Sequence, residues 1–376
     1  MHRVYLDNAA TTALDPAVIQ IMAESMKEDY GNPSSSHSFG RKSRSIIETS
    51  RRNISKLLNS DPSEIFFMSS GTEADNMAIR GAVRDAGVKH IITSRIEHPA
   101  VLNTVSHLLR KKKVTVDYVN TNLMGEIDLN HLDQLLSEKN NVLVSLMHGN
   151  NEIGNLLSLE KVSAICQDKG ALFHSDTVQT IGHYNFDLKK IKIDFLTCSA
   201  HKFHGPKGVG FLYINKNINI TPLIHGGSQE RNMRGGTECV YGIAGLSKAM
   251  EVAYSDIIQH QVHIERLKGY MINLISQKLP FATFNGCSND LSKSLYTVLS
   301  ISFPPNEYGN LLLFNLDLLG VSCSGGSACS SGNVSQSHVI SAIENQGGPV
   351  VRFSFSKFNT LEDIDFAVNQ LVSLFN

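Results

Sequence analysis

The chain has 376 residues, of which 41% are hydrophobic, and a formal net charge of -1. This length favours two domains, or one large domain with an appendage, and the apolar content is enough for a substantial core. A charge so close to zero excludes a bulk attraction to nucleic acid or to anionic membranes.

The cysteines and the N-terminal residues bear on location. None of the six cysteines forms a C-x-x-C pair, which is typical of a reducing compartment. The opening MHRVYLDNAATT reaches an aspartate too early for the apolar core of a signal peptide. No run approaches the roughly 20 apolar residues of a membrane helix. We therefore expect a cytoplasmic protein with no membrane partner and no direct nucleic-acid partner.

Short apolar runs alternate with amphipathic stretches from about residue 60 to residue 215. This alternation predicts βαβ units and a mainly parallel sheet. The last two predicted strands are separated only by residues 201–207, too few for a parallel crossover, so we expect them to be antiparallel. The predicted strands cover residues 65–70, 90–94, 114–119, 141–149, 171–176, 193–200 and 208–214.

A second, smaller unit follows a long helical region at 241–279, which we expect to join the two parts without a strong breaker. This second set of strands and helices predicts an α+β domain. Its predicted elements are a strand at 295–303, a short helix at 308–320, a polar loop at 322–332, a strand at 350–356 and a closing helix from Thr360.

The stretch SAHKFHGPKG, residues 199–208, places two histidines and two lysines between two strands. A metal site is disfavoured because His201 and His204 have no acidic or cysteine partner at zinc-like spacing. A solvent-exposed surface patch is the commonest location for lysine side chains. However, Lys202 directly follows an apolar strand, where active-site residues of α/β sheets gather. A desolvated lysine there could form an imine, and the pattern alone leaves these interpretations open.

Two other strand ends carry polar residues. In MSSGTEADN, residues 68–76, we expect a helix to begin at Thr72, with Thr72 and Asp75 resembling a capping box. Such a helix N-terminus can also bind phosphate. In HSDTVQ, residues 174–179, Asp176 would point into the crevice at the sheet edge. A buried carboxylate there needs a cation, such as a protonated pyridine nitrogen, although an exposed loop aspartate is the commoner case.

Serine and glycine dominate SCSGGSACSSG, residues 322–332, which predicts a mobile loop. The loop carries Cys323 and Cys329. A thiol on a polar loop is unusual because free cysteine is normally buried. Reactivity needs a lowered thiol pKa, so an incidental thiol stays an alternative, above all for Cys323.

Together these motifs resemble the pyridoxal-phosphate-dependent cysteine desulfurases that supply sulfur for iron–sulfur clusters, within the class V aminotransferase superfamily. The resemblance runs almost end to end and in family order. Its motifs are YLDNAATT (5–12), GNPSSSHSFG (31–40), SSGTEADN (69–76), EHPAV (97–101), NNEIG (150–154), HSDTVQ (174–179), SAHKFHGPKG (199–208), GGSQERNMRGGTE (226–238), GGSAC (325–329) and VRFSFSKFNT (351–360).

The resemblance implies an α/β protein of the type I aminotransferase fold, with a mainly parallel seven-stranded sheet sandwiched by helices. A large cofactor-binding domain would cover residues 15–258. Residues 1–14 and 259–376 would form a small α+β domain that carries the catalytic-cysteine loop, about residues 322–334. A homodimer is implied as well, with active sites completed across the subunit boundary.

The resemblance also implies a role for each matching residue. Lys202 would form the internal aldimine with pyridoxal phosphate, Asp176 would pair with the pyridine nitrogen and Gln179 would bond the phenolic oxygen. His98 would stack on the ring and move protons. Thr72, Ser199 and His201 would hold the phosphate, with Thr237 supplied by the other subunit. Asn151, beside the cofactor, and Arg352 would take the substrate carboxylate; an exposed structural arginine is the alternative for Arg352.

Cys329 aligns with the family's catalytic cysteine, and Cys323 does not. The implied reaction converts L-cysteine to L-alanine and leaves the sulfur as a persulfide on Cys329, for iron–sulfur cluster assembly or tRNA thiolation through an acceptor protein. No metal is implied. A selenocysteine lyase or another class V pyridoxal-phosphate enzyme is the alternative enzyme, and a catalytically idle scaffold is the alternative outside enzymes.

Overall fold

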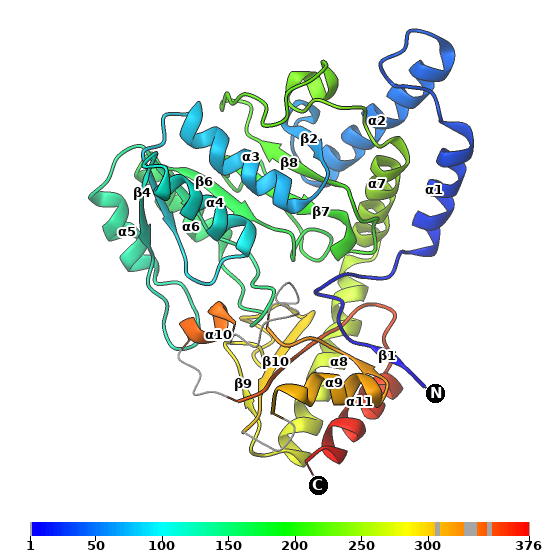
Figure 1. The fold of residues 1–376 in the computed structure, drawn as a ribbon, viewed down its shortest axis with the longest axis vertical. Coiled ribbons are helices and arrows are strands. Elements are labelled where there is room, and N and C mark those ends of the chain that lie inside the picture. The colour runs from blue at the N-terminus through cyan, green and yellow to red at the C-terminus, as the bar shows by residue number, and fades with distance from the viewer. Residues whose placement is uncertain (1, 305–308, 327–336, 344–347, 376) are drawn as a thin grey trace.

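The computed structural model describes residues 2–304, 309–326, 337–343 and 348–375. Its larger part is built around a seven-stranded sheet with the order β2-β8-β7-β6-β5-β3-β4 (Figure 1). Only β8 is antiparallel to its neighbours, β2 and β7, as the short connection predicts. The strands are β2 (Ile65–Met68), β3 (His90–Thr93), β4 (Thr115–Tyr118), β5 (Val142–Ser145), β6 (Leu172–Asp176), β7 (Phe195–Ser199) and β8 (Gly210–Ile214).

Helices cover both faces of this sheet because its central strands are apolar on both sides. Successive side chains of a strand point to opposite faces, so Phe66 joins one core cluster and Phe67 the other. Helices α3 and α4 pack on the Phe66 face, and α2, α5, α6 and α7 pack on the Phe67 face. The helices of this part are α1 (Pro16–Glu28), α2 (Ser38–Leu57), α3 (Gly71–Arg84), α4 (Pro99–Arg110), α5 (Leu129–Ser137), α6 (Leu159–Asp168) and α7 (Val240–Ser255).

The smaller part has its own sheets and its own core. Strands β12, β10 and β9 form an antiparallel sheet, and β1 pairs in parallel with β11. One apolar cluster joins Leu6 near the N-terminus to Ile364 near the C-terminus. The elements are β1 (Val4–Tyr5), α8 (Ile257–Lys278), β9 (Thr283–Phe284), β10 (Val298–Ser302), α9 (Leu312–Leu318), β11 (Val321–Ser322), α10 (His338–Ala342), β12 (Val350–Ser354) and α11 (Leu361–Ser373).

The helical region expected to run unbroken over 241–279 is two helices. Helix α7 ends at Ser255 and α8 begins at Ile257. Between them Asp256 has φ -125° and ψ 23°, which is outside the helical range. The apolar pattern continues across this break, which explains why the sequence did not reveal it.

The N-terminal segment crosses the boundary between the two parts (Figure 1). The Asn8 side chain and the Ala9 amide both donate to Ser354 on β12. A few residues later, the Thr12 amide donates to the carbonyl of His201, beside β7. This segment therefore ties the small sheet to the edge of the large one. Within the described residues, no helix has the length and apolar character needed to span a membrane.

Candidate active site

Three of the predicted site residues, His98, Asp176 and Ser199, lie at one edge of the large sheet. Strands β3, β5, β6 and β7 are parallel, so their carboxyl ends lie together there. Asp176 is the last residue of β6 and Ser199 the last of β7. His98 lies just beyond β3 as the N-cap of α4. A crevice at this edge is the usual ligand site of open α/β sheets.

Lys202 ends a short 3-10 turn, Ala200–Lys202, that directly follows β7. Its Nζ atom donates to the main-chain carbonyls of Ala9, at 2.6 Å, and Ala10, at 2.9 Å. The Gln179 side chain donates to the same Ala9 carbonyl at 3.0 Å. The N-terminal segment thus gathers the lysine and the glutamine at one point, which sequence spacing alone did not indicate.

Asp176 is buried and lies close to Asp75 and His98. One carboxylate oxygen from each aspartate and one ring nitrogen of His98 all lie within 4.8 Å of one another. Burial raises the pKa of Asp176 to about 6, and the nearby Asp75 adds to the shift. Burial also raises the pKa of Asp75 to about 7. The His98 Nδ1 atom accepts the Ala100 amide, so Nε2 carries the proton of the neutral ring.

These buried carboxylates fit a positively charged ring nitrogen. Among the described residues, the Asp176 carboxylate accepts one hydrogen bond, from the Val178 amide at 2.9 Å. Within the part of the chain that the structure describes, Asp75 Oδ1 is buried with no hydrogen-bond partner, although His174 Nε2 lies 3.3 Å away. Orphaned buried acceptors of this kind call for a donor. The same three side chains are able to bind a metal ion. A protonated pyridine nitrogen would equally neutralise the negative charge of the carboxylates.

The start of α3 differs from the predicted one. The helix begins at Gly71, and its N-cap is Ser70, whose side chain accepts the Glu73 amide. The capping box expected of Thr72 and Asp75 is therefore wrong. Ser70 is extended, which aims its hydroxyl at the free amides, and Asp75 turns into the protein instead.

The first turn of α3, which carries Thr72, lies near Ser199 at the end of β7. A Cβ atom added to Gly71 would lie 3.6 Å from the Ser199 Cβ atom, so the first turn of α3 faces the end of β7. Thr72 is exposed on that turn. His201 is partly buried, with Nδ1 3.2 Å from the Thr11 hydroxyl. Burial lowers the pKa of His201 to about 4, and Lys202 and Lys207 contribute.

Arg352 lies on β12 with an exposed fraction of 1%, which rules out the exposed structural arginine. Its Nη2 atom pairs with Asp7 Oδ1 at 2.8 Å, and Nη1 donates to the main-chain carbonyl of Asn151 at 2.8 Å. Nε is buried and has no hydrogen-bond partner among the described residues. The structure thus brings Arg352 and Asn151 together, and it adds Asp7, which the sequence reasoning missed.

The remaining candidates are the two loop cysteines and Thr237. Cys329 lies outside the described residues. Cys323 is partly buried, and burial raises its thiol pKa well above the ordinary value, which disfavours a thiolate there. Thr237 is exposed in the stretch that precedes α7. That stretch is tied to α3 through the ion pair of Arg234 with Glu73.

Comparison with known proteins identifies the family. The class-V aminotransferase family model matches residues 4–366. A cysteine desulfurase IscS from Dictyoglomus turgidum is 42% identical over 374 residues, which cover 98% of this chain and 93% of the relative.

Solved structures agree with this match. A NifS-like protein superposes with a TM-score of 0.91 at 36% identity, covering 99% of both chains. SspA in complex with cysteine superposes with a TM-score of 0.81 at 28% identity, covering 95% of this chain and 99% of that one. The chain belongs to the class-V aminotransferase family, whose cofactor is pyridoxal phosphate. This confirms the resemblance and the fold class that the motifs indicated.

Proposed function

We propose that this protein is a pyridoxal-phosphate-dependent cysteine desulfurase, which converts L-cysteine to L-alanine and keeps the sulfur as a persulfide on Cys329. The observation that carries the proposal is the convergence of Lys202, Asp176 and His98 at one sheet edge. A relative named cysteine desulfurase, similar over nearly the full length, supports the same activity.

The cofactor would be held from several sides. Asp176 would pair with the ring nitrogen, Gln179 with the phenolic oxygen, and Lys202 with the aldehyde carbon. Thr72, Ser199 and His201 would hold the phosphate at the start of α3, where helix amides favour an anion. Bound pyridoxal phosphate supplies an electron sink for the substrate carbon atoms.

The substrate would be held and cleaved by residues of the chain. Arg352 and Asn151 would orient the L-cysteine carboxylate, and His98 would move protons between substrate atoms through Nε2. The Cys329 thiolate would attack the substrate sulfur and form an S–S bond. The Cβ–S bond would break with its electron pair left on carbon, and Cβ would take a proton to give alanine. The balance needs no outside oxidant.

The larger organisation is proposed from the same resemblance. Residues 15–258 would form the cofactor-binding domain, and residues 1–14 with 259–376 the small domain. The separate apolar cores of the two parts support this division. Two copies would form a dimer in which Thr237 reaches the partner's phosphate site. The persulfide would pass to an acceptor protein for iron–sulfur cluster assembly or tRNA thiolation. A cytoplasmic location stays a prediction from cysteine usage.

Purified protein tests the function directly. Wild type should be yellow and should release sulfide and alanine from L-cysteine in the presence of a thiol reductant. Cys329→Ala should keep the colour and lose sulfide release, whereas Cys323→Ala is the matched control and should keep both. Equal sulfide release from Cys329→Ala would contradict the persulfide route. A larger kcat/KM for L-selenocysteine than for L-cysteine would favour the selenocysteine lyase.

A further inference from the structure

His183 lies on the segment that leaves β6, and its imidazole faces the turn that carries Lys202. The Nε2 atom is 3.1 Å from the main-chain carbonyl oxygen of Lys202. A carbonyl oxygen only accepts, so Nε2 must carry the proton and donate. The side chain therefore links the chain leaving β6, which holds Asp176 and Gln179, to the chain leaving β7.

Tyr296 packs against His183 and bonds its main chain. Its hydroxyl lies 3.2 Å from His183 Nδ1 and donates to the main-chain carbonyl of His183 at 2.9 Å. The two rings pack edge to face, with centroids 5.8 Å apart. Burial lowers the pKa of His183 to about 4, so the ring is neutral at pH 7. The single hydroxyl proton of Tyr296 goes to the main-chain carbonyl of His183, so the Lys202 carbonyl, which only accepts, decides that the ring proton is on Nε2.

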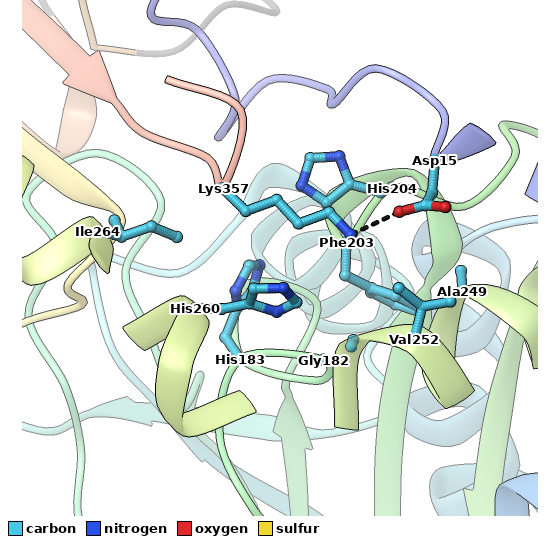
Figure 2. A pocket seen from close by; sticks show the side chains of 11 residues that line it. Asp15, Gly182, His183, Phe203, His204, Ala249, Val252, His260, Ile264 and Lys357 are labelled. Atoms are coloured by element: carbon cyan, nitrogen blue, oxygen red, sulfur yellow. Dashed lines mark hydrogen bonds and ion pairs between the residues drawn. The ribbon is translucent and has the colours of Figure 1, made fainter. Parts of the chain in front are cut away.

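A second contact beside this one joins the same two segments. Gly182 has φ +82°, and an added Cβ atom would lie 2.6 Å from the Phe203 Cβ atom. Only glycine fits so close to Phe203 in this conformation. Figure 2 shows Gly182, His183 and Phe203 lining one pocket. Two adjacent residues of one segment thus contact two adjacent residues of the other.

We propose that His183 is a positioning residue that holds the main chain of Lys202 in register with Asp176. The proposal rests on the assignment of Lys202 and Asp176 to the cofactor under the proposed function. These residues would bind opposite ends of one rigid ring, so the spacing between their two segments has to match a fixed length. A site held loosely by even about 1 Å loses much of its efficiency. The His183 hydrogen bond and the Gly182 contact maintain that spacing.

The rate at which cofactor-free protein takes up pyridoxal phosphate tests the proposal. His183→Phe keeps an aromatic ring and removes the donor, so the yellow chromophore should form about ten-fold more slowly, as expected for one lost hydrogen bond to a buried carbonyl. His183→Gln keeps an N–H group that can donate and should stay within about three-fold of wild type. Borohydride reduction followed by peptide mass spectrometry locates the attached lysine.

His263→Phe is the matched control. The His263 Nε2 atom also bonds a main-chain carbonyl, that of Asn359 at 2.9 Å, but in the small domain. This variant loses the same kind of bond and should take up the cofactor at the wild-type rate. Tyr296→Phe removes only the hydroxyl that donates to the main-chain carbonyl of His183. Because this bond fixes the segment that carries His183, its loss should slow uptake about three-fold. It also keeps the proposal testable if His183→Phe fails to fold.

The possible outcomes are distinct. Uptake by His183→Phe and Tyr296→Phe at the wild-type rate, with the cofactor attached to Lys202, would overturn the positioning role and leave the proposed function intact. Slowing of His263→Phe by the same factor would overturn it too, because the effect would then reflect general loss of stability. Attachment to another lysine in wild type would overturn the assignment of Lys202 under the proposed function.

Discussion

At the scale of single residues, the site is a set of buried acids whose charge depends on what binds them. Asp75, Asp176 and Glu97 are all buried near the same strand ends. Glu97 accepts from the Ser94 hydroxyl at 2.7 Å and from the Met147 amide at 2.9 Å. Burial raises its pKa to about 8, and the two aspartates add to the shift. The cofactor-free protein therefore holds protons that the unfolded chain releases.

This difference predicts a pH dependence of stability that belongs to Glu97. The Glu97 pKa rises from 4.5 to about 8 on folding, so its stabilising contribution is full below pH 4.5 and is lost as pH rises to 8. Buried histidines such as His183 and His201, whose pKa is lowered to about 4, act in the opposite direction below pH 6.5, so the Glu97 contribution is measured against Glu97→Gln. In urea unfolding of cofactor-free protein, the slope of the free energy of unfolding between pH 5 and 8 should be more negative in wild type than in Glu97→Gln, by up to about 1.4 kcal/mol per pH unit. Glu251→Gln, on the exposed face of α7, should follow wild type. Identical slopes for wild type and Glu97→Gln would refute the expectation.

Arg352 makes a second prediction at this scale. Its guanidinium bonds Asp7 and the Asn151 carbonyl at once, and a lysine cannot reproduce that fork. Arg352→Lys should raise the KM for L-cysteine by about ten-fold or more, because a charge-assisted bidentate contact is lost. The yellow chromophore should keep the wild-type intensity. An unchanged KM, measured by alanine release, would remove Arg352 from the substrate site.

At the scale of elements, the beginning of α3 combines a helix cap with the proposed phosphate site. Ser70 forms the cap, and Thr72, which is exposed on the first turn, is assigned to the phosphate. The sequence pattern assigned the cap to Thr72, and the family resemblance assigned phosphate binding to the same residue. The backbone of Ser70 decides between them, because its extended conformation directs the hydroxyl toward the Glu73 amide.

Alanine substitutions should separate the two tasks. Ser70→Ala should lower the free energy of unfolding of cofactor-free protein by about 1 kcal/mol through loss of the cap. Thr72→Ala should change that value by less than about 0.5 kcal/mol, as is usual for a surface position, and should weaken cofactor binding. Urea unfolding and equilibrium titration with pyridoxal phosphate measure the two effects. A loss of stability in Thr72→Ala but not in Ser70→Ala would reverse the assignment.

At the scale of the whole molecule, a long stretch before α7 lies firmly against the large sheet while its end remains exposed. Glu230 accepts from both Nη atoms of the buried Arg51 at 2.8 Å, and from the Phe67 amide at 2.7 Å. Thr237, a few residues further on, is exposed. An anchored segment with an exposed end suits a side chain that completes a site on a second copy.

Mixed dimers test this directly. Lys202→Ala removes the attachment lysine, and Thr237→Val weakens the phosphate site, so each homodimer should have low activity. If Thr237 serves the partner subunit, a dimer with one copy of each variant contains one complete site. Heterodimers purified through two different tags should then release alanine at about half the wild-type rate. Activity no higher than that of the Thr237→Val homodimer would show that Thr237 acts within its own chain.

The sequence by itself determined the features that depend on local order. Apolar runs of β-branched residues and helical periodicity predicted all seven strands of the large sheet and the antiparallel pair around Lys202. Asp176 and Lys202 follow strands directly, so the parallel arrangement of those strands was enough to bring them to one edge. Their roles came from the motifs around them, whose family the comparisons confirm.

Only the tertiary structure decided the contacts between distant segments. The Arg352–Asp7 pair spans 345 positions of the chain, and Gln179 bonds the Ala9 carbonyl across 170. No local pattern encodes such pairs, because they depend on how the two cores pack against the N-terminal segment. Main-chain groups such as the Ala9 and Lys202 carbonyls leave no mark in the sequence at all. The hydrogen bond from His183 to Lys202 is therefore visible only once the chain is folded.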